Sequence, residues 1–179
     1  MTDDTLLLAA LGVIQARGAI GERSLIAAVR HADRFVDSIP SGTQSIIDLG
    51  SGGGLPALVV AWHRADVIVT MVERRATRAD LLRRAVITLG LGDRTTVLAT
   101  DVALVCADFP GAFDVVTARS FGDIATTVRF AATLVVEGGL ILVSEPPTDR
   151  SEQWAQALSR YPRLADEGVY QGIRRLIHR

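Results

Sequence analysis

The fold of this chain is decided by Ile46-Ile47-Asp48-Leu49-Gly50-Ser51-Gly52-Gly53-Gly54-Leu55-Pro56. An apolar run breaks here into alternating glycines and resumes at residues 57–62, which predicts a strand, a tight turn and a helix. Glycines at positions 50, 52 and 54 permit positive φ angles and let a ligand approach without meeting a Cβ atom. The helix that follows presents unpaired N–H groups, so the stretch is typical of a nucleotide-binding loop.

The glycine spacing distinguishes between two kinds of nucleotide ligand. A dinucleotide-binding loop needs G-x-G-x-x-G, whereas this chain has G-x-G-x-G with Asp48 two residues before Gly50. A second strand is predicted at residues 67–72 and ends at Glu73, 23 residues after Gly50, where a carboxylate is expected to bind ribose hydroxyls. Ribose recognition without a pyrophosphate loop indicates S-adenosylmethionine as the cofactor.

The rest of the chain continues the alternation of strands and helices. Apolar periodicity predicts helices at about 4–17, 22–39, 77–89, 123–134 and 149–160, strands at 94–98, 112–118, 140–144, 164–170 and 173–178, and a turn at 137–139. This order predicts an α/β fold, with a Rossmann-like sheet, helices on both faces and a terminal antiparallel hairpin. We expect one domain over residues 1–179, in which a helical segment at 1–40 precedes the Rossmann-like core at 41–179.

Composition limits the partners of the chain. With 49% hydrophobic and 22% charged residues, the 179 residues suit one globular domain. The formal net charge of −1 lacks the overall basic character of many nucleic-acid binders, so RNA binding would need a local basic patch. All 19 basic residues are arginine, whose forked guanidinium binds phosphate bidentately.

Cysteine and histidine usage excludes several classes of enzyme. Cys106 is the one cysteine, and no secretory segment or long apolar run is present, so a reducing cytoplasm and no membrane association are expected. One cysteine and three histidines do not give a Ser/His/Asp set, a Cys/His pair or a metal cluster with sensible spacing. Hydrolases and metalloenzymes are therefore excluded, and no metal is expected.

Three motifs recur in the order found in a known family. They are residues 48–56, residues 69–74 followed by Arg78 and Leu81-Leu82, and residues 113–119, which close with the specific pair Ala118-Arg119. From about residue 30 to residue 143 the chain resembles the bacterial small-subunit rRNA guanine-N7 methyltransferases, the glucose-inhibited division protein B family. The resemblance implies a class I methyltransferase that uses S-adenosylmethionine and methylates N7 of a guanine in 16S rRNA, free or in the small ribosomal subunit.

The resemblance also implies a set of site residues. No catalytic residue is expected, because guanine N7 has a lone pair and no proton to remove. Asp101 is the candidate for binding the adenine amino group, although an ungapped alignment places Val102 under the family's glutamate, and Asp101 alternatively caps a helix at 102–107. The predicted cofactor-binding residues are Asp48, Gly50, Ser51, Gly52, Gly54, Leu55, Glu73, Asp101, Val102 and Arg119, and the predicted substrate-binding residues are Arg30, Arg78 and Arg119.

Arg119 follows the fourth strand, where such a sheet opens to its ligand, and its alternative role is a salt bridge to Glu73, Asp101 or Asp123. For His31 we favour a packing or surface role. For Arg174-Arg175 we favour the solvated face of a strand.

Two departures from the family pattern keep a second hypothesis open. The family's asparagine-leucine-threonine turn is missing near the N-terminus, and Ser144-Glu145-Pro146-Pro147 stands where the family has a lysine-glycine pair. Both changes lower the affinity for RNA that we expect of this chain. The alternative is therefore a small-molecule methyltransferase of the same fold.

Overall fold

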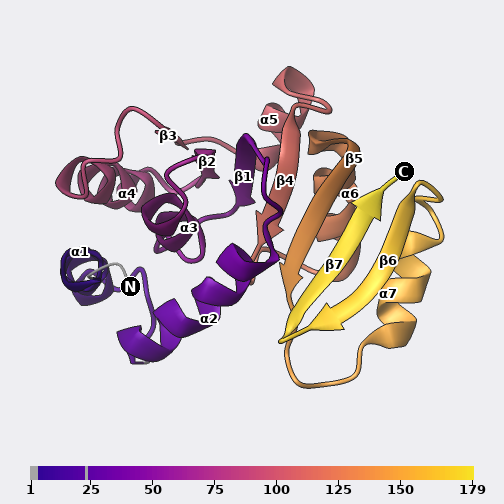
Figure 1. The fold of residues 1–179 in the computed structure, drawn as a ribbon, viewed down its shortest axis with the longest axis horizontal. Coiled ribbons are helices and arrows are strands. Elements are labelled where there is room, and N and C mark those ends of the chain that lie inside the picture. Colours follow the sequence, from indigo (N-terminus) through magenta and orange to yellow (C-terminus); the bar gives the residue numbers. More distant parts are fainter. Residues whose placement is uncertain (1–3, 23) are drawn as a thin grey trace.

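A computed structural model describes residues 4–22 and 24–179, which form one seven-stranded sheet flanked by helices (Figure 1). The helices are α1 (Thr5–Ala16), α2 (Leu25–Ser38), α3 (Ala57–His63), α4 (Ala76–Thr88), α5 (Val102–Asp108), α6 (Ile124–Leu134) and α7 (Ser151–Leu158). The strands are β1 (Ser45–Leu49), β2 (Ile68–Val72), β3 (Thr95–Leu98), β4 (Phe113–Ala118), β5 (Val135–Ser144), β6 (Leu164–Tyr170) and β7 (Ile173–His178).

The order of the strands places the ligand-binding edge of the sheet. The order is β3-β2-β1-β4-β5-β7-β6, in which β1 to β5 are parallel, β7 is antiparallel to β5, and β6 is antiparallel to β7. The chain changes direction across the sheet between β1 and β4, and in such sheets ligands bind beyond the carboxyl ends of the strands at that point. The predicted Rossmann-like sheet with a terminal hairpin is confirmed.

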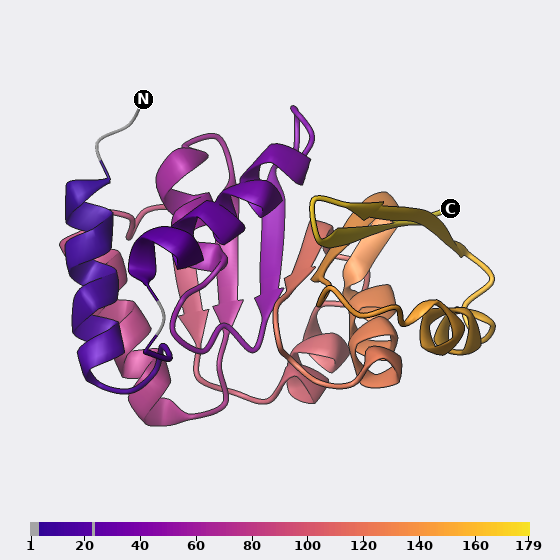
Figure 2. The same cartoon turned by 90° about the horizontal axis from the view of Figure 1, so that it is seen from below.

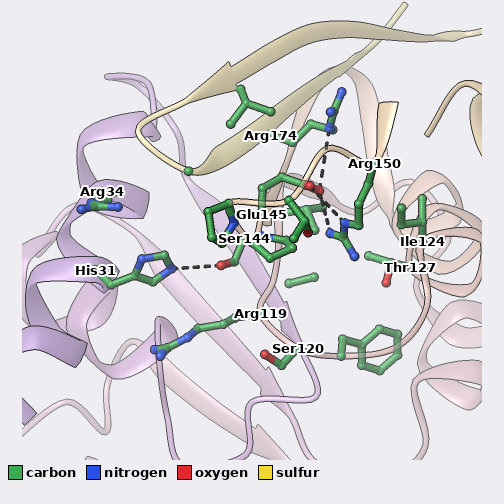
Figure 3. Close-up of a pocket in the computed structure, with 18 of the residues that line it drawn as sticks. His31, Arg34, Arg119, Ser120, Ile124, Thr127, Ser144, Glu145, Arg150 and Arg174 are labelled. Atoms are coloured by element: carbon green, nitrogen blue, oxygen red, sulfur yellow. Dashed lines mark hydrogen bonds and ion pairs between the residues drawn. The ribbon is translucent and has the colours of Figure 1, made fainter. Parts of the chain in front are cut away.

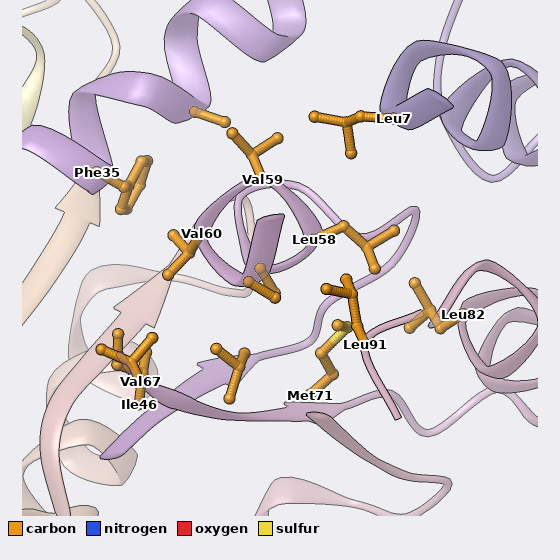
Figure 4. Close-up of a cluster of buried hydrophobic side chains, with 14 of the residues drawn as sticks. Leu7, Phe35, Ile46, Leu58, Val59, Val60, Val67, Met71, Leu82 and Leu91 are labelled. Atoms are coloured by element: carbon orange, nitrogen blue, oxygen red, sulfur yellow. The ribbon is translucent and has the colours of Figure 1, made fainter. Parts of the chain in front are cut away.

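Helices cover both faces of the sheet, as the continuous apolar strands require (Figure 2). Ile46 of β1 packs into a cluster with α1 to α4, whereas its neighbour Ile47 packs into a second cluster with α5 to α7. In the first cluster, Leu58, Val59 and Val60 of α3 lie between α1, α2 and the sheet (Figure 4). The two cores together fix the carboxyl ends of β1, β2 and β4 relative to one another.

One predicted element is wrong. The turn expected at 137–139 lies inside β5, which begins at Val135 and has an irregular register with β4 between Phe113 and Val115. A bulge absorbs the extra residues, and a Cβ atom at Gly139 would lie only 2.8 Å from the Asp114 carbonyl oxygen. The glycine pair therefore allows two strands to approach closely and does not end a strand.

Within the described part of the chain, no helix combines the length and the apolar character that crossing a membrane requires.

Candidate functional site

The glycine loop after β1 has one position that opens away from the protein. A Cβ atom on Gly53 would lie 2.8 Å from the Ala19 carbonyl oxygen, and one on Gly54 would lie 2.4 Å from a leucine side chain of α3. At Gly52, which has a φ of +54°, the nearest atom to such a Cβ would be the Gly50 carbonyl oxygen at 3.7 Å. Gly53 and Gly54 therefore serve packing within the protein, whereas the space on the Cβ side of Gly52 is open.

Glu73 fixes this loop to the end of β2. Its side chain is buried, and its two carboxylate oxygens accept hydrogen bonds from the Gly52 N–H at 2.9 Å and from the Arg75 N–H at 2.8 Å. The structure thus brings together the glycine loop and the carboxylate that the sequence spacing had paired. A carboxylate held by two backbone N–H groups is rigid, and one of the two belongs to Gly52.

Asp48 is a buried carboxyl group beneath the same loop. Thr117 of β4 donates a 2.6 Å hydrogen bond to its Oδ1 atom, and its Oδ2 atom has no hydrogen-bond partner among the described residues. Burial raises the pKa of Asp48 to about 6, while the bond from Thr117 and the positive charge of Arg119 act in the opposite direction. An unpaired oxygen on a buried acid is costly, which indicates a cationic or hydrogen-bonding partner at this position.

The raised pKa of Asp48 gives the ligand-free protein a specific pH dependence. Between the ordinary value of 3.8 and the folded value of about 6, the folded state holds a proton that the unfolded state has lost. The free energy of unfolding therefore falls by roughly 3 kcal/mol as the pH rises from about 4 to about 6, and this term is constant above pH 6.

Asp48→Asn removes that titration. We expect the difference in urea midpoint between the variant and the wild type to shift in favour of the variant across pH 4–6. If the urea midpoints of the variant and the wild type change with pH in the same way across this range, Asp48 is ionised in the folded protein.

The other predicted cofactor residues lie within the loop or at the start of α5. Asp101 is exposed and caps α5 by accepting a 2.9 Å bond from the Ala103 N–H, which is the alternative role expected for it. Val102 and Ser51 are buried, and the Ser51 N–H donates to the Val72 carbonyl at 2.8 Å. Leu55 packs against the first core cluster. Asp101 and Val102 as adenine contacts stay predictions.

A large cavity of about 1270 Å³ opens beyond the carboxyl ends of β4 and β5 (Figure 3). We call it the central pocket. Arg119 and Ser120 enter it from the end of β4, and Ser120 has a φ of +55°, a left-handed conformation that is uncommon for a residue with a side chain. Its charged and titratable lining residues include His31, Arg34, Arg119, Glu145, Asp149, Arg150 and Arg174. Arginines outnumber acids in this lining, so the pocket suits an electron-rich or anionic group.

His31 lines the central pocket, and the sequence did not predict this position for it. Its Nε2 atom lies 3.0 Å from the Ser144 Oγ atom of β5, and its ring packs edge-on against Phe35 at 6.1 Å. Burial lowers the pKa of His31, and the charges of Arg119 and Arg34 lower it further. The imidazole is therefore neutral at pH 7. It packs as expected, but it also faces a cavity.

Glu145 is the centre of a buried cluster that links β5, α7 and β7. It accepts a 2.6 Å bond from Trp154 Nε1 and a 2.9 Å bond from Arg150, and Arg174 lies over the Trp154 ring at 4.8 Å. The interpretation of Arg174 as part of a solvated face is wrong, because the residue is only 7% exposed and its guanidinium is covered by the Trp154 ring of α7. The acid that replaces the family's cation is thus neutralised by arginines that other elements supply.

The three predicted substrate arginines lie in different places. Arg119 enters the central pocket, Arg30 is exposed on α2, and Arg78 lines a groove between α1 and α4. The structure does not bring them into one cluster. Over residues 4–22 and 24–179, no group of three or more His, Cys, Asp or Glu side chains could hold a metal ion.

Comparison with models of protein families shows which family the chain belongs to. The model of GidB, rRNA small subunit methyltransferase G, matches residues 13–159. The chain belongs to this family. A Salinispora arenicola protein named ribosomal RNA small subunit methyltransferase G is 40% identical over 144 residues, which are 74% of this chain and 57% of that protein. The protein of the same name from Kineococcus radiotolerans is 37% identical over 139 residues, or 74% and 52% of the two chains.

The GidB family member described here spans about half the length of the curated relatives it matches. Solved structures agree on its fold. Cofactor-bound Rv0187 from MTB superposes with a TM-score of 0.75 at 19% identity, covering 99% of this chain and 91% of the other. The SAH-bound methyltransferase PaMTH1 of Podospora anserina gives 0.73 at 15% identity, covering 100% and 89%. At these identities the likeness establishes a methyltransferase-like fold.

Proposed function

We propose that this chain transfers a methyl group from S-adenosylmethionine to N7 of a guanine in small-subunit rRNA. The proposal is supported by membership of the GidB family and by the names of the relatives, which are rRNA methyltransferases. The observation that carries it is the glycine loop, in which Gly52 has open space on its Cβ side and is bonded to the buried Glu73, together with the buried carboxyl group of Asp48 on the strand before it. These groups suit a ligand that carries both a cation and a hydroxylated sugar.

The residues present fit that cofactor. The Oδ2 atom of Asp48 lacks a partner among the described residues, and a cationic ligand would offset the cost of burying its charge. Glu73 would bind the ribose, and the missing side chain of Gly52 would leave room for the ligand. When bound, S-adenosylmethionine supplies an electrophilic methyl group. Gly50, Ser51, Gly54, Leu55, Asp101, Val102 and Arg119 complete the proposed cofactor site.

The acceptor side needs positioning and no proton transfer. Guanine N7 presents an in-plane lone pair, so the protein must align the base and exclude water. Arg119 stands at the mouth of the central pocket with a fixed positive charge, which suits a phosphate or the oxygen edge of a base. Neutral His31 lies across the same pocket and can exchange a hydrogen bond with Ser144 or with the acceptor. Arg30 and Arg78 would contact the substrate outside the pocket.

Glu73→Gln tests whether Glu73 belongs to the cofactor site. The amide cannot accept both backbone bonds, so we expect cofactor affinity to fall by roughly 1–3 kcal/mol, the range for a buried polar group left without its partner. Titration calorimetry with S-adenosylmethionine measures this loss. Glu137→Gln, which changes an exposed carboxylate paired with Arg163, is the matched control and should bind as the wild type does. Equal affinity in both variants would remove Glu73 from the site.

The function itself is tested with purified protein and a labelled methyl donor. We expect transfer to small ribosomal subunits or 16S rRNA prepared without the modification, and none to subunits that already carry it. A protein that binds S-adenosylmethionine but leaves both RNA substrates unlabelled would favour the small-molecule alternative. A protein that does not bind S-adenosylmethionine would contradict the proposal at its first step.

A further inference from the structure

A second groove, of about 700 Å³, lies between α1 and α4. We call it the α1–α4 groove. Four arginines line it, namely Arg17 at the end of α1 and Arg75, Arg78 and Arg84 along α4. Its floor is apolar and includes Val13, a residue that is 60% exposed. In a chain of net charge −1, this is a local concentration of positive charge.

The guanidinium groups of these four arginines form no salt bridge within the described part of the chain. Asp80, the one acid among the described residues of the lining, is paired with Arg83 at 2.8 Å. Arg75 and Arg78 also lie at the N-terminus of α4, where the helix dipole disfavours a cation and no acid lies in the first turn. Their charge is therefore available to an external anion.

The groove and the central pocket meet at a shared ridge. The segment between α1 and α2 supplies Gly18 and Ala19 to the groove, and Ile20 and Gly21 to the central pocket. The same segment rests on the glycine loop, because a Cβ atom on Gly53 would meet Ala19 and Ile20. Figure 2 shows that the end of α1 and the start of α4 lie at the edge where the strands β1 and β2 end. A long ligand can therefore occupy the groove and reach the pocket across one short ridge.

We propose that the α1–α4 groove binds the phosphate backbone of the rRNA strand whose target guanine enters the central pocket. This inference rests on the proposed function. The nine-residue interval from Arg75 to Arg84 corresponds to about 13 Å along the helix, which is long enough to contact more than one phosphate of a single strand. Guanidinium groups bind phosphate bidentately, and the apolar floor suits the ribose and base faces between the phosphates.

The test removes the charge and keeps the fold. The groove variant is Arg17→Gln, Arg78→Gln, Arg84→Gln; Arg75 is left unchanged so that the segment whose backbone N–H binds Glu73 is not disturbed. The control variant is Arg129→Gln, Arg160→Gln, Arg163→Gln, which removes three exposed arginines on the α6–α7 side. Binding to transcribed 16S rRNA is measured over a salt series for both variants and the wild type, and S-adenosylmethionine affinity is measured by calorimetry for each.

We expect the groove variant to bind rRNA about 10- to 100-fold more weakly near 0.1 M salt, and its log–log salt slope to be shallower by about 2 to 3. The control variant should keep the wild-type slope, and cofactor affinity should be equal in all three proteins. A groove variant with the wild-type slope, or a control variant that loses as much, would overturn the proposal while methyl transfer by the wild type still supported the function. If the wild-type protein does not bind rRNA, the proposal that the α1–α4 groove binds the rRNA backbone is also overturned. The proposed function is contradicted separately, by the absence of methyl transfer to rRNA.

Discussion

Gly52→Val is expected to abolish measurable binding of S-adenosylmethionine. Gly52 is the position of the glycine loop where an added Cβ atom meets no protein atom closer than 3.7 Å, so the valine side chain would extend into the space left for the ligand. The same substitution at Gly53 or Gly54 would clash with the protein itself and would report on folding. Gly52 therefore separates ligand binding from packing better than its neighbours do.

The conformational cost of Gly52→Val needs a matched control. Gly52 has a φ of +54°, and valine in this region costs roughly 1–2 kcal/mol or more of stability. Gly111→Val places the same residue at a φ of +59° with no atom within 4 Å, at the opposite edge of the sheet before β4. We expect both variants to melt at similar temperatures and only Gly52→Val to lose the cofactor. Calorimetry showing normal binding by folded Gly52→Val would place the cofactor elsewhere.

Arg119→Ala is expected to lower kcat/KM for methyl transfer to rRNA by roughly 100-fold, as removal of a charge-assisted contact at the reacting centre does. The melting temperature should change little, because Arg119 is half-buried at the mouth of a pocket. If Arg119 contacts a phosphate, the salt slope for rRNA should also become shallower by about one. Loss of its charge should raise the pKa of Asp48 further, since Arg119 lowers it in the wild type.

Arg119→Lys distinguishes charge from geometry. Lysine keeps the positive charge without the guanidinium fork, so a phosphate contact should be largely restored and a bidentate contact to a base edge should not. Transfer rates and cofactor affinity are measured together for both variants. Wild-type transfer by Arg119→Ala, or a loss confined to cofactor affinity, would leave Arg119 without a role toward the acceptor.

The sequence predicted those parts of the site that depend on local pattern. The glycine loop and Glu73 are recognisable because each follows a strand directly, and parallel strands end at one edge of a sheet. Asp101 remained ambiguous, because one exposed aspartate before a helix satisfies both the cap and a cofactor contact. The structure shows the cap.

The parts that were missed depend on contacts between distant residues. His31 and Ser144 are 113 positions apart, and no spacing rule brings them to one pocket. Arg174 was assigned to a solvated face because a terminal hairpin does not reveal which of its strands pairs with β5. The pair Gly138-Gly139 was read as a turn, because sequence alone does not distinguish a turn from a bulge that continues the strand.

The most direct test of the proposed function is a map of N7-methylguanine in small-subunit rRNA from cells with and without the gene. The proposal predicts that one modified guanine disappears on deletion and returns when the wild-type gene is supplied. It also predicts that the Gly52→Val gene does not restore the modification, whereas the Gly111→Val gene does. An unchanged map after deletion would contradict rRNA as the substrate.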